Sequence, residues 1–250
     1  MKKIIQLWVH PRSLSTAMER VFIERGDFTV FHEPFAYTYY LEDGVTDCAN
    51  FHIDESKPRK YEDVRQALLD AAEEKPVFSK DMSYHAALHL KADQAFFQRC
   101  INTFMIREPR KTILSHYRCS PNLTLDEVGY LRSWELVRLA ADYNGNVPPV
   151  IIDADDLEND PVGIVKAYCQ AVGIEFLADA MNWEADKEVP EWNQWAEWHV
   201  DATRSCGIQK NMETFDFELD DIKSPNLRSY YEFSLPLYEA MYKLRLQPIK

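Results

Sequence analysis

The sequence lacks several features that would narrow its function quickly. It has no G-x-x-x-x-G-K-[ST] phosphate loop, the usual signature of a nucleoside-triphosphate site. No apolar run approaches the ~18 residues of a membrane-spanning helix, and Pro11-Arg12 interrupts an N-terminal stretch already too short for a signal peptide. The five cysteines are odd in number and show no CxxC spacing, so we expect reduced thiols and a cytoplasmic chain.

Positive charge is also scarce. The 250 residues include 28 Lys and Arg against 41 Asp and Glu, a formal net charge of −13. This balance argues against duplex DNA, RNA or an anionic membrane as the main partner, because the field of the whole protein repels polyanions. A local basic pocket can still bind one small anion.

What the sequence does have is an alternation of apolar strands with amphipathic helices. We expect strands at 4–9, 28–31, 76–80, 103–106 and 149–152, and helices at 15–25, 61–74, 92–99, 109–117, 125–141 and 161–172. This order predicts an α/β fold in three layers, with helices on both faces of a mainly parallel sheet. No linker is evident, so we expect one domain over 1–250, with a core at 1–176 and a Trp-rich, helical C-terminal region at 177–250.

Polar residues follow four of the expected strands. Ligands of such sheets bind beyond the carboxyl ends of the strands, so we expect these residues to converge on one rim. They are Arg12, Ser13, Ser15 and Thr16 after the first strand, His32 and Glu33 after the second, Lys80 and Asp81 after the third, and Arg107 and Arg110 after the fourth.

The turn after the first strand has the composition of an anion site. A helix N-terminus offers backbone N–H groups, Ser15 and Thr16 add hydroxyls, and Arg12 adds charge with forked donors. Residues 11–16 resemble the P-R-S-G-S-T loop of sulfotransferases, which binds the 5′-phosphosulfate of 3′-phosphoadenosine-5′-phosphosulfate (PAPS). Leu14 stands where that loop has its conformationally free glycine. The resemblance implies that the donor is bound by Arg12, Ser13, Leu14, Ser15, Thr16 and Ala17.

Two further motifs resemble the same family, in the same order. Residues 107–117 resemble R-[DE]-P-R-x-x-x-x-S-x-[YF], which implies that Arg107 and Ser115 hold the donor's 3′-phosphate. Residues 150–176 are similar to a structural motif in which Asp-Pro opens a helix that ends at Gly, here Asp160, Pro161 and Gly173. With the first loop, the resemblance covers residues 4–176 and implies a P-loop-like sulfotransferase fold of the bacterial small-molecule type.

The resemblance also implies catalytic groups. Glu33 is similar to the general base in the E-P-F motif of one branch of the family, and we expect partial burial to raise its pKa. His32, His10 and His85 remain rival bases. Lys80 resembles the lysine of the family's F-x-K motif, which implies that it stabilises leaving-group charge together with Arg12. We expect no metal, and the pair His85-x-x-x-His89 is interpreted as one helix face.

The acceptor is expected to be a small organic molecule with a hydroxyl or an amine. Candidate contacts are His32, Phe35, Tyr37 and Trp195. Tyr39, Tyr40 and the four tryptophans between 183 and 198 serve equally well as an acceptor wall, a packing lid or the contact of a possible homodimer. Arg204 or Lys210 is a candidate for one more 3′-phosphate contact.

Two other functions remain open. A P-loop-type small-molecule kinase would normally need a Gly-Lys pair and an Asp that holds Mg²⁺, neither of which is evident. A non-catalytic nucleotide-binding protein would explain the departure at Leu14 and the unmatched C-terminal third.

Overall fold

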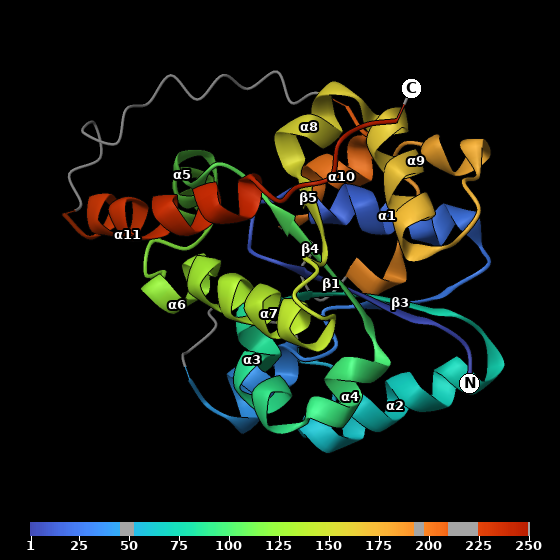
Figure 1. The fold of residues 1–250 in the computed structure, drawn as a ribbon, viewed down its shortest axis with the longest axis horizontal. Helices are drawn as coiled ribbons and strands as arrows, with labels where there is room; N and C mark the ends of the chain where they lie inside the picture. The colour runs from blue at the N-terminus through green and yellow to red at the C-terminus, as the bar shows by residue number, and fades with distance from the viewer. Residues whose placement is uncertain (46–52, 193–197, 210–224, 250) are drawn as a thin grey trace. The chain divides into compact units, whose positions relative to one another are not determined.

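A computed structural model describes residues 1–45, 53–192, 198–209 and 225–249 (Figure 1). Five strands form one sheet in the order β2-β3-β1-β4-β5, and β2 pairs in parallel with β3, with His32 opposite Lys80. The strands are β1 (Ile4–Val9), β2 (Thr29–His32), β3 (Val77–Met82), β4 (Ile101–Ile106) and β5 (Val150–Asp153). The single parallel sheet with its many helices confirms the predicted α/β class.

The helices connect these strands. They are α1 (Ser15–Arg25), the π-helix η1 (Thr38–Glu42), α2 (Tyr61–Glu74), α3 (Ser83–Ala92), α4 (Gln94–Arg99), α5 (Pro109–Cys119), α6 (Leu125–Val128), α7 (Tyr130–Tyr143), α8 (Ala154–Asn159), α9 (Pro161–Val172), the 3₁₀-helix η2 (Ala178–Met181), α10 (Val200–Arg204) and α11 (Pro225–Tyr242). Within the described ranges, no helix combines the length and apolar character needed to cross a membrane.

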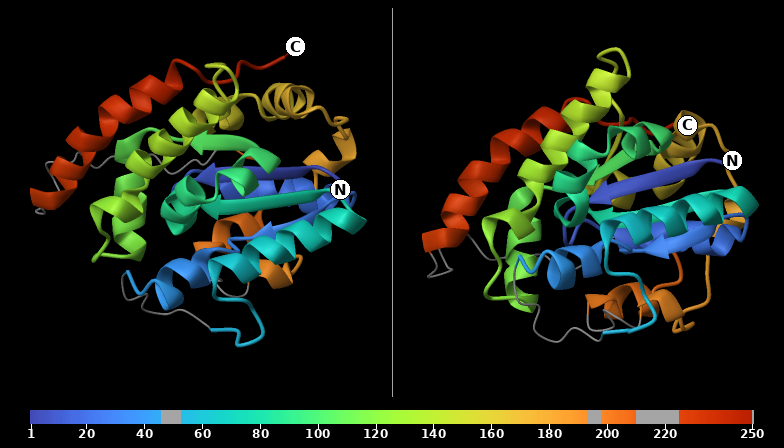
Figure 2. Two further views of the ribbon diagram at one scale, coloured as in Figure 1. Left: turned by 60° about the horizontal axis from the view of Figure 1, so that its bottom comes forward. Right: turned by 90° about the horizontal axis from the view of Figure 1, so that it is seen from below.

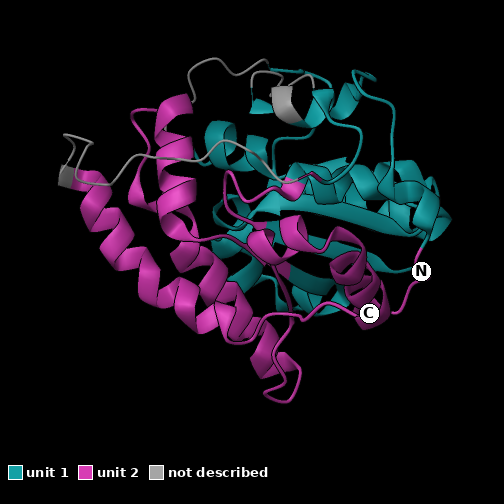
Figure 3. Ribbon diagram, turned by 90° about the horizontal axis from the view of Figure 1, so that it is seen from above, with its two compact units in different colours: residues 1–8, 16–103, 177–208 teal, residues 9–15, 104–176, 209–250 magenta. Residues whose placement is uncertain are grey.

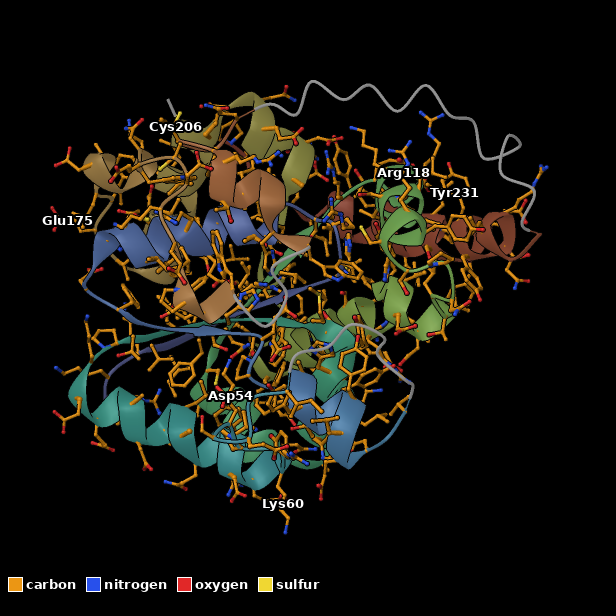
Figure 4. All side chains as sticks on the ribbon, turned by 180° about the vertical axis from the view of Figure 1, so that it is seen from behind. Asp54, Lys60, Arg118, Glu175, Cys206 and Tyr231 are labelled. Atoms are coloured by element: carbon orange, nitrogen blue, oxygen red, sulfur yellow. The ribbon has the colours of Figure 1, made fainter. Side chains whose placement is uncertain are left out.

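The chain divides into two compact units (Figure 3). Unit 1 holds residues 1–8, 16–103 and 177–208, and unit 2 holds residues 9–15, 104–176 and 209–250. In unit 1, α2 lies along β3 (Figure 2), and α3 packs on η1. In unit 2, α11 packs on α5 and α7. Figure 4 labels Tyr231 on α11 and Arg118 on α5.

Three local features differ from the sequence-based expectation. The helix expected at 125–141 is broken at Gly129, which has φ +86° and ends α6 directly after the Thr124–Glu127 capping box. Helix α3 extends over Ser83–Ala92, whereas only His85 and His89 were expected to share a helix face there. No helix was expected between residues 152 and 161, whereas α8 forms there, capped by the Asp153 side chain, which accepts from the N–H groups of Asp155 and Asp156.

Other helix boundaries follow the sequence signals. Asp160 caps α9 by accepting from the Gly163 N–H, Pro161 begins the helix, and Gly173 ends it with φ +69°. All six residues of β1 are buried, as expected for a strand covered on both faces. A rigid, buried β1 fixes the start of the turn that follows it.

Candidate active site

The turn between β1 and α1 has an unusual backbone. Arg12 has φ +63° and Leu14 has φ +66°, values in the left-handed region that non-glycine residues disfavour. Between them, buried Ser13 donates its hydroxyl to the His10 carbonyl at 2.7 Å. Leu14 therefore adopts a glycine-like conformation at the position where the sulfotransferase loop has glycine.

In unit 2, Arg12 lies beside the predicted 3′-phosphate residues. Its Nε donates to the Ser115 hydroxyl at 2.7 Å, and Arg107 Nη1 donates to the Arg12 carbonyl at 3.3 Å. The Arg107 backbone is anchored as well, because its N–H donates to His10 Nε2 and its carbonyl accepts from the Tyr130 hydroxyl. We call Arg12, Arg107 and Ser115 the arginine cluster. The three come together as the sequence motifs predicted.

Carboxylates face the arginine cluster. Arg107 Nη2 lies 3.1 Å from Glu158 Oε1, and Arg107 Nε lies 3.6 Å from Asp155 Oδ1. Asp155 also accepts from Lys111 Nζ at 2.6 Å. An anion that binds Arg107 must therefore compete with groups of its own charge. Neither Asp155 nor Glu158 was among the residues expected at the site, and the place of Glu158 near the end of α8 carries no motif signal.

Two buried histidines of unit 2 stay uncharged near neutral pH. Burial and the nearby Arg107 charge lower the pKa of His10 to about 4, although its bond with the Pro11 carbonyl opposes them. Burial, with Arg12 and His10 nearby, lowers the pKa of His116 to about 3. His10 was a candidate for the general base, but its Nε2 already accepts the Arg107 N–H and so holds the Arg107 backbone in place.

Unit 1 contains a second group of functional side chains, all buried. Lys80 Nζ lies 2.6 Å from Glu33 Oε1 and 3.5 Å from Glu19 Oε2. Lys80 and Glu19 are 0% exposed and Glu33 is 6% exposed, so one ammonium faces two carboxylates away from water. Glu33 has φ +46°, a strained value for a residue with a side chain. With His32 and His199, these residues form what we call the carboxylate–lysine cluster.

The expectation of a raised Glu33 pKa was wrong. Burial does raise it, but the ammonium of Lys80 and the neighbouring His32 outweigh burial and hold the pKa of Glu33 well below its usual range. The pKa of Glu19 is lowered in the same way, with burial opposed by His32 and Lys80. Burial tends to lower the pKa of Lys80, yet Glu33 and Glu19 raise it overall. The cluster thus holds full charges.

Two imidazoles complete the carboxylate–lysine cluster. His32 Nδ1 lies 2.8 Å from Glu19 Oε2, and His32 Nε2 lies 3.1 Å from His199 Nε2. Trp192 Nε1 donates to Glu19 Oε1 at 3.0 Å. The sequence analysis missed Glu19, which lies mid-helix in α1, and gave His199 no role of its own. An acidic residue on the buried face of α1 was the available signal.

His32, Glu33 and His199 have ligand atoms within 4.8 Å of one another, a spacing that a metal ion tolerates. Lys80 argues against a metal here, because its ammonium already occupies Glu33 Oε1 and repels a cation. His32 also directs Nδ1 to Glu19, so only Nε2 remains for other partners. The geometry suits a proton network better than a metal.

Two of the residues expected to contact the acceptor, Phe35 and Tyr37, are buried. Phe35 is fully buried, stacks on Tyr61 and donates its N–H to Asp81. Tyr37 is 2% exposed, and its hydroxyl accepts from the Asp54 N–H. Both residues thus lie in the packed interior of unit 1. Ala17 is buried in α1, Arg204 is exposed at the end of α10, and Trp195 and Lys210 lie outside the described residues.

Comparison with known proteins places this architecture in a family. A family model described as a sulfotransferase domain matches residues 1–244. The chain therefore belongs to the sulfotransferase-domain family, which confirms the family inferred from the three motifs.

Individual relatives agree on the fold. The sulfotransferase domain from the curacin biosynthetic pathway is 14% identical with a TM-score of 0.54, over 100% of this chain and 94% of that chain. A sulfotransferase from Alicyclobacillus acidocaldarius is 13% identical with a TM-score of 0.52, over 97% of each chain.

A relative in sequence covers nearly the whole chain. The Arabidopsis thaliana branched-chain-amino-acid aminotransferase-like protein 2 is 29% identical over 248 residues, which are 96% of this chain and 41% of that protein. The chain thus spans about two fifths of the length of that curated relative.

Proposed function

We propose that this protein transfers the sulfuryl group of PAPS to a hydroxyl or amine of a small organic acceptor. The observation that carries the proposal is the arginine cluster, in which Arg12, Arg107 and Ser115 come together after the turn that replaces a phosphate loop. Membership of the sulfotransferase-domain family supports it. The cytoplasmic location and the homodimer expected from the sequence remain predictions.

In this proposal the donor spans two sets of groups. Residues 12–17 bind the 5′-phosphosulfate through backbone N–H groups, hydroxyls and the Arg12 guanidinium, and Arg107 with Ser115 binds the 3′-phosphate. The acceptor oxygen or nitrogen attacks sulfur as the bond from sulfur to the bridging phosphate oxygen breaks, and adenosine 3′,5′-bisphosphate leaves. The acceptor proton passes to Glu33. Arg12 and Lys80 offset the charge that develops on the leaving phosphate.

The ion pair between Lys80 and Glu33 gives this chemistry a physical basis. A carboxylate with a lowered pKa is always ionised but is a weak base. If the Lys80 ammonium turns toward the leaving phosphate during transfer, Glu33 loses its counter-charge inside a buried site. Its pKa then rises, and it accepts the acceptor's proton more readily. No metal is needed for any of these steps.

Calorimetric titration tests the donor site. We expect adenosine 3′,5′-bisphosphate to bind the wild type, and Arg107→Ala to weaken that binding by roughly 100-fold through loss of a charge-assisted phosphate contact. Arg118→Ala is the matched control, because Arg118 lies on the same helix α5 and is exposed. Binding of Mg·ATP alone would contradict the proposal and favour the kinase. Binding of neither nucleotide would contradict the proposal, because the loop at residues 12–17 would then have no phosphate ligand.

The catalytic roles need a separate test. With an acceptor in hand, Glu33→Gln should lower kcat by about 100-fold or more while the affinity for adenosine 3′,5′-bisphosphate stays within about threefold. Lys80→Ala should also lower kcat, because leaving-group charge is no longer offset. Turnover that survives both changes would remove both residues from the mechanism. A protein that binds the nucleotide but turns over no acceptor would favour the non-catalytic binder.

A further inference from the structure

A chain of polar groups crosses unit 1 from Glu19 to Thr16. Glu19 Oε2 faces His32 Nδ1 at 2.8 Å, and His32 Nε2 faces His199 Nε2 at 3.1 Å. At the far end, His199 Nδ1 lies 3.3 Å from the Thr16 hydroxyl oxygen. The two imidazole rings are buried, whereas Thr16, in the first turn of α1, is partly exposed. The chain therefore connects an interior carboxylate to a hydroxyl that a ligand can reach.

The contact between the two rings restricts where protons can be. Two imidazole nitrogens at hydrogen-bonding distance need one proton between them, since two lone pairs or two N–H groups would repel. His32 directs Nδ1 at a carboxylate, so that nitrogen carries a hydrogen. Either both rings are neutral and His199 donates to His32, or His32 is charged and donates to His199.

The surrounding charges favour the second arrangement. Glu19 and Thr16 from α1, Glu33 beyond β2 and the Trp192 ring contact the two imidazoles. The charged and titratable groups next to these acids include Lys80 and Asp81 from β3 and His85 from α3. Lys80 pairs with Glu33 at 2.6 Å and His85 pairs with Asp81 at 2.6 Å, which leaves Glu19, 3.5 Å from Lys80, as the second acid that faces His32. A buried site with an unbalanced charge is costly, and a proton on the imidazole pair restores the balance.

We propose that His32 and His199 share one extra proton, and that this proton determines whether the Thr16 hydroxyl donates to the sulfuryl donor. With the proton present, His32 donates to His199, and His199 donates through Nδ1–H to Thr16. The Thr16 proton is then available to an oxygen of the donor's 5′-phosphosulfate. When the proton leaves to solvent, His199 donates to His32 instead, its Nδ1 accepts from Thr16, and the donor loses one hydrogen bond. His199 is thus a positioning residue, and this step rests on the proposed donor site.

The cost of removing the Thr16 hydroxyl tests the proposal. We expect Thr16→Val to weaken the binding of adenosine 3′,5′-bisphosphate by roughly tenfold at low pH, where the shared proton is present. The ratio of the dissociation constants of Thr16→Val and the wild type should approach one as pH rises across about pH 5 to 9. This is the range in which imidazoles titrate, with their usual shifts. Using the ratio at each pH cancels the titration of the ligand's own phosphates. A ratio that is the same at every pH would overturn the proposal.

Two variants separate the relay from a structural effect. Thr16→Ser keeps the hydroxyl and should show the pH dependence of the wild type. In a His199→Phe background the ring remains but the nitrogens are gone, so the Thr16→Val penalty should no longer depend on pH. A penalty that still depends on pH in that background would exclude His199 as the intermediary.

A readout without nucleotide distinguishes this proposal from the proposed function. In ¹⁵N NMR spectra of the ligand-free wild type, the His32 and His199 imidazole nitrogens should titrate together with the loss of one proton. Two independent titrations would overturn the proposal even if the nucleotide binds. If the nucleotide does not bind at any pH, the proposed function fails, and a coupled titration would still support the shared proton.

Discussion

Two buried acids, one in each unit, have pKa values that are shifted in opposite directions. In unit 1, burial raises the pKa of Glu33, but Lys80 and His32 outweigh burial and hold it low. In unit 2, burial and the neighbouring Asp155 carboxylate raise the pKa of Asp153 to about 6, against hydrogen bonds from the Asp156 N–H and Tyr238 that lower it. Burial acts alike in both cases. What differs is the sign of the nearest charge, and this decides whether a buried acid remains ionised near neutral pH.

This difference fits the roles proposed for the two units, proton transfer in unit 1 and anion binding in unit 2. Unit 1 keeps opposite charges together in a dry cluster, which suits proton transfer. Unit 2 pairs Arg107, whose side chain keeps 11% exposure, with carboxylates that an incoming anion can replace, which suits reversible binding of an anion. The predictions below test this contrast in order of the expected effect.

The largest effect is expected for Lys80→Met. This change leaves Glu19 and Glu33 buried without their counter-charge, so we expect the free energy of unfolding to fall by about 3–5 kcal/mol. Urea denaturation measures it. The matched variant in unit 2 is Lys111→Met, whose ion pair with Asp155 is about one third exposed and should contribute less than about 1 kcal/mol. Equal losses in the two variants would abolish the contrast between the units.

Asp153→Asn should stabilise the protein at neutral pH. The pKa of Asp153 is about 6 in the folded state and near 3.8 when unfolded, so the folded state binds more protons between these values. Stability is therefore lost as pH rises through that window. Asparagine removes this loss and still caps α8, because its side-chain oxygen accepts the same N–H groups. We expect a gain of about 2 kcal/mol at pH 7.

The pH dependence provides the control for Asp153→Asn. At about pH 3 the wild-type carboxyl is mostly protonated in both states, so the two proteins should be almost equally stable there. Urea denaturation at about pH 3 and about pH 7 measures both differences. A gain that is equal at both pH values would mean that ionisation of Asp153 is not its source.

Glu158→Gln should strengthen nucleotide binding. The change removes a carboxylate that competes for Arg107 Nη2 but keeps a side chain of the same shape. We expect the affinity for adenosine 3′,5′-bisphosphate to rise about fivefold by calorimetry, because the phosphate no longer has to displace the Glu158 carboxylate from Arg107. Asp156→Asn is the control, since Asp156 pairs with Arg245 instead. Weaker binding in Glu158→Gln would show that Glu158 orients Arg107 rather than competing with it.

Much of the fold followed from the sequence because its signals are local. Apolar runs and caps gave β1, α2 and α9 closely, and the order of strands and helices gave the α/β class. The break at Gly129 was missed because the apolar pattern continues through it, and only the backbone geometry interrupts the helix. The helical spacing of apolar residues carries no information about one residue with a left-handed backbone conformation.

The site was less predictable because its electrostatics depend on partners distant in the chain. Motifs brought Arg12, Arg107 and Ser115 together correctly. No motif indicated that Glu19 would lie 3.5 Å from Lys80, or that the charges of Lys80 and His32 would reverse the direction of the Glu33 pKa shift. A carboxylate's pKa is set by its three-dimensional neighbours, which spacing along the chain does not reveal.

The smallest expected effect concerns Leu14, the one departure from the family loop. Its φ of +66° costs a leucine about 1–2 kcal/mol, whereas glycine adopts this backbone freely but loses more entropy on folding. The two terms nearly cancel, so Leu14→Gly should gain between zero and about 1 kcal/mol of stability in urea. Leu88→Gly is the control, because Leu88 is exposed within helix α3, where glycine should cost about 1 kcal/mol. If Leu14→Gly is as destabilising as Leu88→Gly, the leucine side chain contributes packing that outweighs its backbone strain.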